Sequence, residues 1–110
     1  MKMTVGDIIR HNKRGSEYEV VGKIHELVLN LVDGQELLLS TTDGGDWSLR
    51  ERNYPYEIRL PVRYQTSLPR ESAWVDVVLY RALVSKKGEP WLFARPLSEF
   101  TEDRFTKVPT

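Results

Sequence analysis

The chain has 110 residues, with 16 basic and 16 acidic side chains, 40% hydrophobic residues and no cysteine. That length suits one domain, the composition excludes a disordered or low-complexity chain, and the lack of thiols excludes a disulfide scaffold and a cysteine nucleophile. Because no apolar run approaches the roughly 18 residues of a membrane span and no signal-peptide core is seen, we expect a cytoplasmic protein with no membrane segment.

The neutral total charge hides an acidic centre. Residues 25–57 hold seven acidic and two basic side chains, whereas the segments on either side are weakly basic. A protein that binds DNA over much of its surface would carry a clear positive excess. We therefore expect no chain-wide nucleic-acid footprint, and only a local basic patch stays open as an alternative.

The first clear strand is expected at residues 17–24, where apolar residues alternate with Glu19 and other polar residues. Gly22 inside this segment predicts a bulge or a bend. We interpret Glu17 and Glu19, which fall on one face of the strand, as solvated surface. The segment therefore predicts a half-buried strand with a local irregularity.

A tight turn is expected at Asp33-Gly34, between apolar runs at residues 28–32 and 35–39. An Asp-Gly pair tolerates the positive φ angles of a type I′ turn, which joins two antiparallel strands. The pattern predicts a β-hairpin made of these two runs.

The middle of the chain is expected to alternate between loops and strands. Residues 41–53 are polar and predict a loop, and residues 56–65 predict a strand that Pro61 either interrupts or confines to a sheet edge. Residues 74–84 are the longest apolar stretch and are hydrophobic on both faces. Such a strand is typical of the centre of a sheet.

The last third predicts a second hairpin, with a turn at residues 86–89 and a strand at 91–95. Pro96 is expected to stop that strand, residues 97–100 to form one helical turn, and residues 105–108 to close the sheet. No window shows a convincing helical period. The fold class is therefore all-β: a small barrel or a strongly bent antiparallel sheet with an inserted hairpin, in one domain.

Catalytic and metal-binding patterns are absent from the sequence. His11 and His25 are the only histidines and have no cysteine beside them, which argues against zinc. The acidic segment at 43–46 lacks the alternating oxygens of an EF-hand. No nucleophile elbow and no phosphate-binding glycine loop occurs. We expect no metal, no cofactor and no enzymatic activity.

Two basic features are open to a binding interpretation. Residues 10–14 form a basic run that is either a solvated turn or an anion-facing loop. Trp91, Phe93 and Arg95 share one strand face, and Arg95 is expected to stack on an aromatic ring or pair with a carboxylate. The candidates for ligand or nucleic-acid binding are Arg10, His11, Lys13, Arg14 and Arg95.

The two ends of the chain resemble a small bacterial and phage family of unknown function. The resemblance rests on residues 6–15, residues 18–22, residues 77–83 and the ending Trp91-Leu92-Phe93-Ala94-Arg95-Pro96 with Phe100. It implies an SH3-like barrel with no established activity. Relative to that family, residues 25–73 are an insertion.

We expect a non-catalytic protein-binding module, and the resemblance suggests a phage accessory protein that modulates or inhibits a host defence system. The inserted acidic segment is the favoured contact, with candidate residues Asp43, Asp46, Trp47, Glu51 and Tyr54. The alternatives are a single-stranded nucleic-acid-binding barrel and capture of a small anionic or nucleotide ligand.

Overall fold

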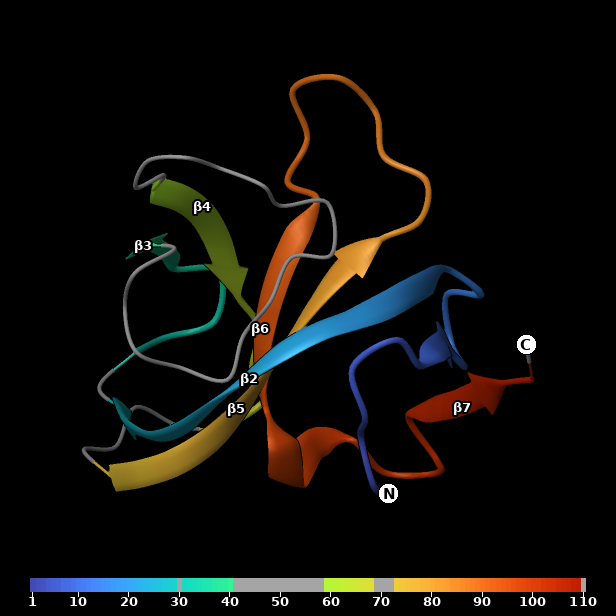
Figure 1. The fold of residues 1–110 in the computed structure, drawn as a ribbon, viewed down its shortest axis with the longest axis horizontal. Helices are drawn as coiled ribbons and strands as arrows, with labels where there is room; N and C mark the ends of the chain where they lie inside the picture. Colours follow the sequence, from blue (N-terminus) through green and yellow to red (C-terminus); the bar gives the residue numbers. More distant parts are fainter. Residues whose placement is uncertain (30, 41–58, 69–72, 110) are drawn as a thin grey trace.

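Seven strands and one short 3-10 turn make up the regular structure in the computed structural model, which describes residues 1–29, 31–40, 59–68 and 73–109 (Figure 1). The strands are β1 (Ile8–His11), β2 (Glu17–Leu29), β3 (Glu36–Ser40), β4 (Arg59–Tyr64), β5 (Ala73–Ala82), β6 (Leu92–Pro96) and β7 (Phe105–Val108), and the turn is η1 (Leu97–Glu99). The predicted β-rich fold is confirmed. No helix in the described ranges is long and apolar enough to cross a membrane.

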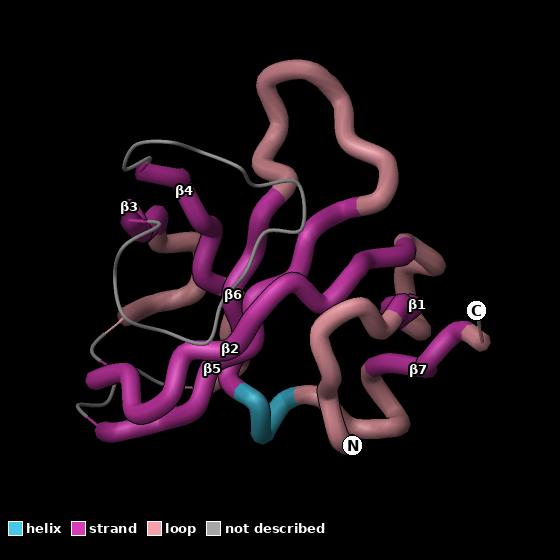
Figure 2. Tube along the Cα trace, in the orientation of Figure 1, coloured by secondary structure: helices cyan, strands magenta, loops and turns pink. Residues whose placement is uncertain are grey.

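The strands form a single sheet in the order β3-β4-β6-β5-β2-β1-β7. Neighbouring strands are antiparallel except β4 and β6, which run parallel where Arg63 faces Phe93 and Tyr64 faces Ala94. The sheet is therefore mixed, where the sequence predicted an antiparallel one. The sheet ends at β3 on one side and at β7 on the other, so it is not closed into a barrel. Figures 1 and 2 show that it is strongly curved.

The central position predicted for residues 74–84 is confirmed, because β5 lies between β2 and β6. Alternate residues of a strand point to opposite faces of its sheet. Val77 and Leu79 of β5 accordingly enter one hydrophobic core and Val78 and Tyr80 enter another. The first core consists of Val21, Val62, Tyr64, Val77, Leu79, Leu92 and Ala94. The second core consists of Met3, Ile9, Val20, Val78, Tyr80, Phe100 and Phe105.

The bulge predicted at Gly22 is also confirmed. The register of β2 against β5 shifts between Val20 and Gly22, and shifts again further along β2. Bulges increase the local twist of a strand, and β2 and β5 curve together across the sheet in Figure 1. Glu19, however, is 5% exposed rather than solvated. It is buried because Arg81 faces it in the register and binds its Oε1 at 2.8 Å.

The Asp33-Gly34 turn forms, but the predicted hairpin does not. Gly34 has a φ of +82°, and the Gln35 amide donates to the Val32 carbonyl across the turn. Yet β3 pairs with β4 instead of β2. The turn is tied to the end of β4 instead, because the Thr66 amide donates to Asp33 Oδ1 at 2.8 Å and the Gly34 amide donates to the Tyr64 carbonyl at 2.8 Å.

Pro61 lies inside β4, at a point where β4 is locally an edge of the sheet. It pairs with Leu38 of β3, and β6 joins the other side of β4 only from Arg63 onward. The proline therefore has a strand on one side only, which its missing N–H allows. The expected insertion, residues 25–73, supplies β3, β4 and the last five residues of β2. The loop predicted at 41–53 lies outside the described residues.

The final third follows the sequence closely. β5 and β6 form the predicted hairpin, with Tyr80 opposite Phe93. η1 is the predicted helical turn, and β7 forms an edge strand beside β1. β1 itself was not predicted, and it places Arg10 and His11 in a strand and leaves only residues 12–15 in the turn.

Candidate functional site

The most concentrated polar chemistry in the described chain is a buried ion pair between Arg95 at the end of β6 and Glu99 in η1. Their side chains approach to 2.9 Å between Nη1 and Oε1, and the two residues are 8% and 6% exposed. Glu99 also accepts hydrogen bonds from the Thr66 hydroxyl at 2.6 Å and from the Ser67 amide and hydroxyl at 3.0 and 3.1 Å. Arg104 Nη1 lies 3.4 Å from the same carboxylate.

Arg95 is held on its other side by the hydroxyl of Tyr80, which accepts from Nε at 3.3 Å, and by Gln65, whose Oε1 accepts from Nη2 at 3.3 Å. The Tyr80 hydroxyl donates in turn to Gln65 Oε1 at 2.7 Å. Burial raises the pKa of Tyr80 to about 12, so this hydroxyl keeps its proton. The guanidinium also lies 5.8 Å from the centre of the Phe105 ring.

This network of Gln65, Thr66, Ser67, Tyr80, Arg95, Glu99 and Arg104, which we call the buried lock, holds elements together and is not an open binding site. It ties the segment after β4 to the end of β6 and to η1, and its donors and acceptors are already used by one another. Arg95 both pairs with a carboxylate and lies over an aromatic ring, as one interpretation of the sequence expected. Its guanidinium is not presented to a ligand. The sequence pattern did not indicate Glu99 as a site residue, and its only signal is the four-residue spacing from Arg95.

The other basic candidates lie together at the β1–β2 turn. Arg10 pairs with Glu17 at 3.3 Å, with both side chains partly exposed. The Arg14 amide donates to Nδ1 of His11 at 3.3 Å, and the His11 ring packs edge-on against Phe105. Burial lowers the pKa of His11, and the charges of Arg14 and other nearby cations lower it further. The turn is thus a locally positive surface.

Three exposed apolar side chains lie on the loop between β5 and β6, residues 83–91, and one of them, Val84, is the most exposed large apolar side chain of the described residues. Val84 is 90% exposed, Leu83 is 43% exposed and Trp91 is 36% exposed. A tight turn closes the loop, where the Glu89 amide donates to the Lys86 carbonyl. Figure 2 shows the loop projecting well beyond the strands. We call residues 83–91 the projecting loop.

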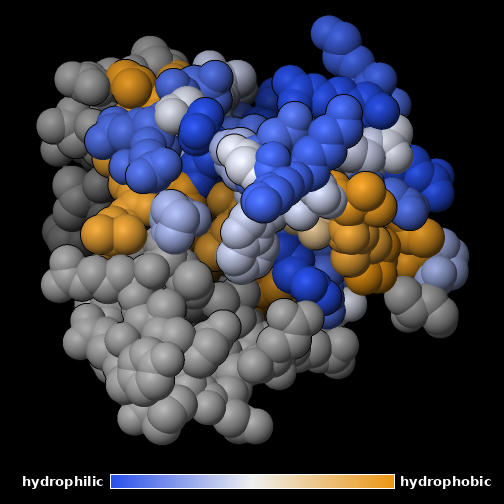
Figure 3. Space-filling view, turned by 90° about the horizontal axis from the view of Figure 1, so that it is seen from above, coloured by the Kyte–Doolittle hydropathy of each residue, from blue (hydrophilic) through white to orange (hydrophobic). Residues whose placement is uncertain are grey.

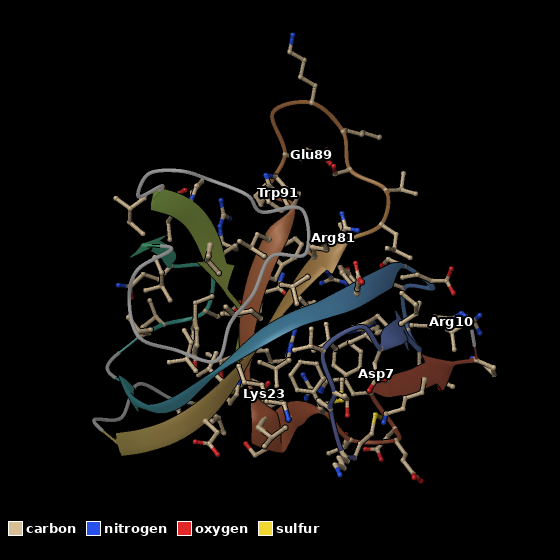
Figure 4. All side chains as sticks on the ribbon, in the orientation of Figure 1. Asp7, Arg10, Lys23, Arg81, Glu89 and Trp91 are labelled. Carbon is tan, nitrogen blue, oxygen red and sulfur yellow. The ribbon has the colours of Figure 1, made fainter. Side chains whose placement is uncertain are left out.

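Two hollows flank the projecting loop. The first hollow encloses about 390 Å³, and its lining includes Glu17, Tyr18, Leu83, Glu89, Pro90 and Phe93. The second hollow encloses about 380 Å³, and its lining includes Glu36, Pro61, Arg63, Glu89, Pro90 and Trp91. Glu89 and Pro90 form a shared wall. Figure 3 looks down on this end of the molecule and shows hydrophobic surface beside hydrophilic side chains, and Figure 4 marks Glu89 on the loop and Trp91 where the loop meets β6.

The residues expected to bind a partner lie outside the described residues. They are Asp43, Asp46, Trp47, Glu51 and Tyr54. The projecting loop was recognised from the sequence only as a turn. Its signal as a surface, an exposed Leu83-Val84 pair directly after a central strand, becomes visible once β5 is known to end at Ala82.

Comparison with family models, with curated proteins and with solved structures found no match to the chain. Among the residues that the structure describes, no three histidine, aspartate or glutamate side chains gather in a way that could hold a metal ion.

Proposed function

We propose that the chain is a non-catalytic protein-binding module whose contact surface includes the projecting loop. The observation that carries this proposal is the exposure of Val84, Leu83 and Trp91 on one loop. Exposed apolar side chains that gather next to hollows are typical of surfaces that bind other proteins. Trp91 is the natural anchor, because tryptophan dominates many protein interfaces.

The gain available from this loop is substantial. Burying one valine or leucine side chain stabilises a complex by about 1.5–3 kcal/mol, before the costs of association are subtracted. The loop joins β5 and β6, which pair over five residue positions in the middle of the sheet. Its two ends are therefore fixed before a partner arrives, and this limits the conformational entropy lost on binding.

The resemblance of the two ends of the chain to a bacterial and phage family suggests a biological role for this binding module. We propose an SH3-like relationship for the curved sheet, and a role as a phage accessory protein that modulates a host defence system. Both rest on the resembling residues 6–15, 18–22, 77–83 and 91–100 alone. The acidic residues of segment 25–57 would act as a second contact that speeds association with a basic partner.

A second candidate is the binding of single-stranded nucleic acid or a small anion at the β1–β2 turn. It is favoured by the exposure of Lys13 and Arg14, for which no carboxylate lies within ion-pair distance among the described residues. Burial is the larger cause of the lowered pKa of His11, and the charges of Arg14 and Lys13 lower it further. The mixed charge of the neighbouring turn, with Glu102 and Asp103, makes this the weaker candidate.

The test is a pull-down from a lysate of the source organism, with and without nuclease, using the wild type and the double variant Leu83→Ser/Val84→Asp. A protein that is retained after nuclease treatment and lost with the double variant supports the proposal. Val5→Asp is the matched control. Val5 is also an exposed valine, but it lies near the start of the chain, before β1, and not on the projecting loop. Equal retention by the double variant and the wild type would contradict the projecting loop as the contact.

The same assay separates the remaining surfaces. The triple variant Arg10→Ala/Lys13→Ala/Arg14→Ala should be silent for a protein partner and should abolish retention of nucleic acid. Charge reversals at Asp43, Asp46 and Glu51 should slow association with a basic partner. Retention that disappears with nuclease and with the triple variant would replace the protein-binding proposal by the nucleic-acid one.

A further inference from the structure

The first hollow combines an aromatic floor with an acidic rim. Tyr18 and Phe93 form the floor, and the two charged residues in its lining, Glu17 and Glu89, are both acidic. Leu83 adds aliphatic surface to one side. No cation is part of this lining, although Lys86 and Lys87 belong to the same loop.

The aromatic floor is held rigidly by the second core. The rings of Tyr18 and Tyr80 meet edge-on at 5.2 Å, those of Tyr18 and Phe93 edge-on at 5.9 Å, and those of Tyr80 and Phe93 stack at 5.6 Å. The Tyr18 hydroxyl donates to Ser16 Oγ at 3.2 Å, which fixes the outer edge of the floor. A floor that is ordered before binding reduces the entropy cost of receiving a side chain.

The carboxylates of the acidic rim have oxygens available to accept hydrogen bonds from a partner. Glu17 accepts one bond from Arg10 at Oε2, and Arg10 is not part of the lining. Glu17 Oε1 has no partner among the described side chains, and neither has the carboxylate of Glu89. An exposed ion pair such as Arg10–Glu17 is worth less than about 1 kcal/mol, so a second cation can share Glu17 at little cost.

We propose that the first hollow receives a basic side chain, arginine or lysine, from the protein partner. This inference rests on the proposed protein-binding function and names the chemistry of the partner. The aliphatic stem of such a residue covers the apolar wall, its positive head lies near the aromatic faces, and Glu17 and Glu89 neutralise the charge. The second hollow already contains Arg63 in its lining, so it offers a less favourable place for a cation.

The experiment is an NMR titration of the full chain with capped tripeptides that differ only in the central residue. The probes are acetyl-Gly-Arg-Gly-amide, its lysine counterpart, its citrulline counterpart and its glutamate counterpart. Citrulline matches arginine in shape but carries no charge. The readout is the backbone amide shifts of residues 15–18, 82–85, 89 and 91–93.

We expect the arginine and lysine peptides to shift these amides with dissociation constants of about 1–10 mM, and the citrulline and glutamate peptides to bind at least about tenfold more weakly. Arginine binding should weaken with salt. The double variant Glu17→Gln/Glu89→Gln should weaken it by about tenfold or more, while Glu36→Gln in the second hollow should leave it unchanged.

Three results would overturn the inference: citrulline binding as tightly as arginine, shifts centred on the second hollow, or no shift with about 20 mM arginine peptide. The amide spectrum of each variant shows directly whether its fold is kept. If the arginine peptide fails while Leu83→Ser/Val84→Asp still loses its protein partner, the protein-binding proposal stands and the basic-side-chain inference falls. If the peptide binds but the loop variant retains its partner, the first hollow does bind a basic side chain, and the projecting loop is not the contact for that partner.

Discussion

Replacing Glu99 by glutamine removes the charge at the centre of the buried lock and keeps the shape of the side chain. The wild-type carboxylate accepts bonds from Thr66, Ser67 and Arg95 at 2.6–3.1 Å, with Arg104 at 3.4 Å. Glutamine retains one acceptor oxygen and places an amide N–H₂ group where the second oxygen faced hydrogen-bond donors. Arg95 is then left as a buried cation without a counter-charge.

The expected cost follows from this loss. Removing one partner of a buried ion pair destabilises a protein by about 3–5 kcal/mol. Because the glutamine keeps part of the hydrogen bonding and Arg95 keeps Tyr80 and Gln65, we expect the lower end, about 3 kcal/mol. For a domain of this size each kcal/mol lowers Tm by about 4 °C, so Glu99→Gln should lower Tm by about 12 °C.

Urea unfolding followed by tryptophan fluorescence measures this difference. Glu17→Gln is the matched control, because it breaks an exposed ion pair and should cost less than about 1 kcal/mol. The double variant Arg95→Met/Glu99→Gln should cost at least about 2 kcal/mol less than the sum of the two single variants, because it leaves no buried charge unpaired. A Glu99→Gln protein within about 1 kcal/mol of the wild type would refute the assignment of the lock.

The pH dependence of stability provides an independent check. Burial opposes ionisation of Glu99, but the hydrogen bonds from Thr66 and Ser67 and the charge of Arg95 outweigh it, and the pKa is lowered below its ordinary value of 4.5. A carboxyl group whose pKa is lower in the folded state stabilises the fold above its unfolded pKa, and this stability is lost as the pH falls through the folded value. The wild type should therefore lose stability below about pH 4.5 more steeply than Glu99→Gln does.

Three further predictions concern the turns and the metal content. Gly34 has a φ of +82° and open space around its α-carbon, so Gly34→Val should cost about 1 kcal/mol or more through backbone strain. Gly34→Asn should cost less, and equal Tm values for wild type and Gly34→Val would contradict the turn. Arg14→Ala should raise the pKa of His11 towards 6.5 in an NMR titration, though not fully, because burial is the larger cause. An unchanged pKa would show that Arg14 does not act on the ring. EDTA should leave Tm unchanged, and a large drop would reveal a metal that the sequence does not indicate.

The elements that were predicted correctly depend on neighbours along the chain. The bulge at Gly22, the positive φ at Gly34 and the β5–β6 hairpin each follow from residue type and local alternation. The central place of β5 follows from its apolar character on both faces. These features need no knowledge of distant residues.

The pairing of β3 could not be predicted in the same way. Residues 35–39 are equally able to pair with β2 or with β4 by their hydrophobic pattern. The choice is made by residues at the end of β4: Thr66 binds Asp33 from 33 positions away, and the Tyr64 carbonyl accepts from the Gly34 amide. Both facts are properties of the folded molecule.

The sequence by itself determined the β-rich class, the turns and the central strand, because periodicity and backbone preference act over a few residues. Only the tertiary structure decided the strand order, the parallel contact of β4 with β6, the burial of Glu99 and Arg95, and the exposure of Val84. The physical reason is the same for each. Burial of a charge or exposure of an apolar side chain depends on which distant segments surround it, and the folding of the whole sheet brings those segments together.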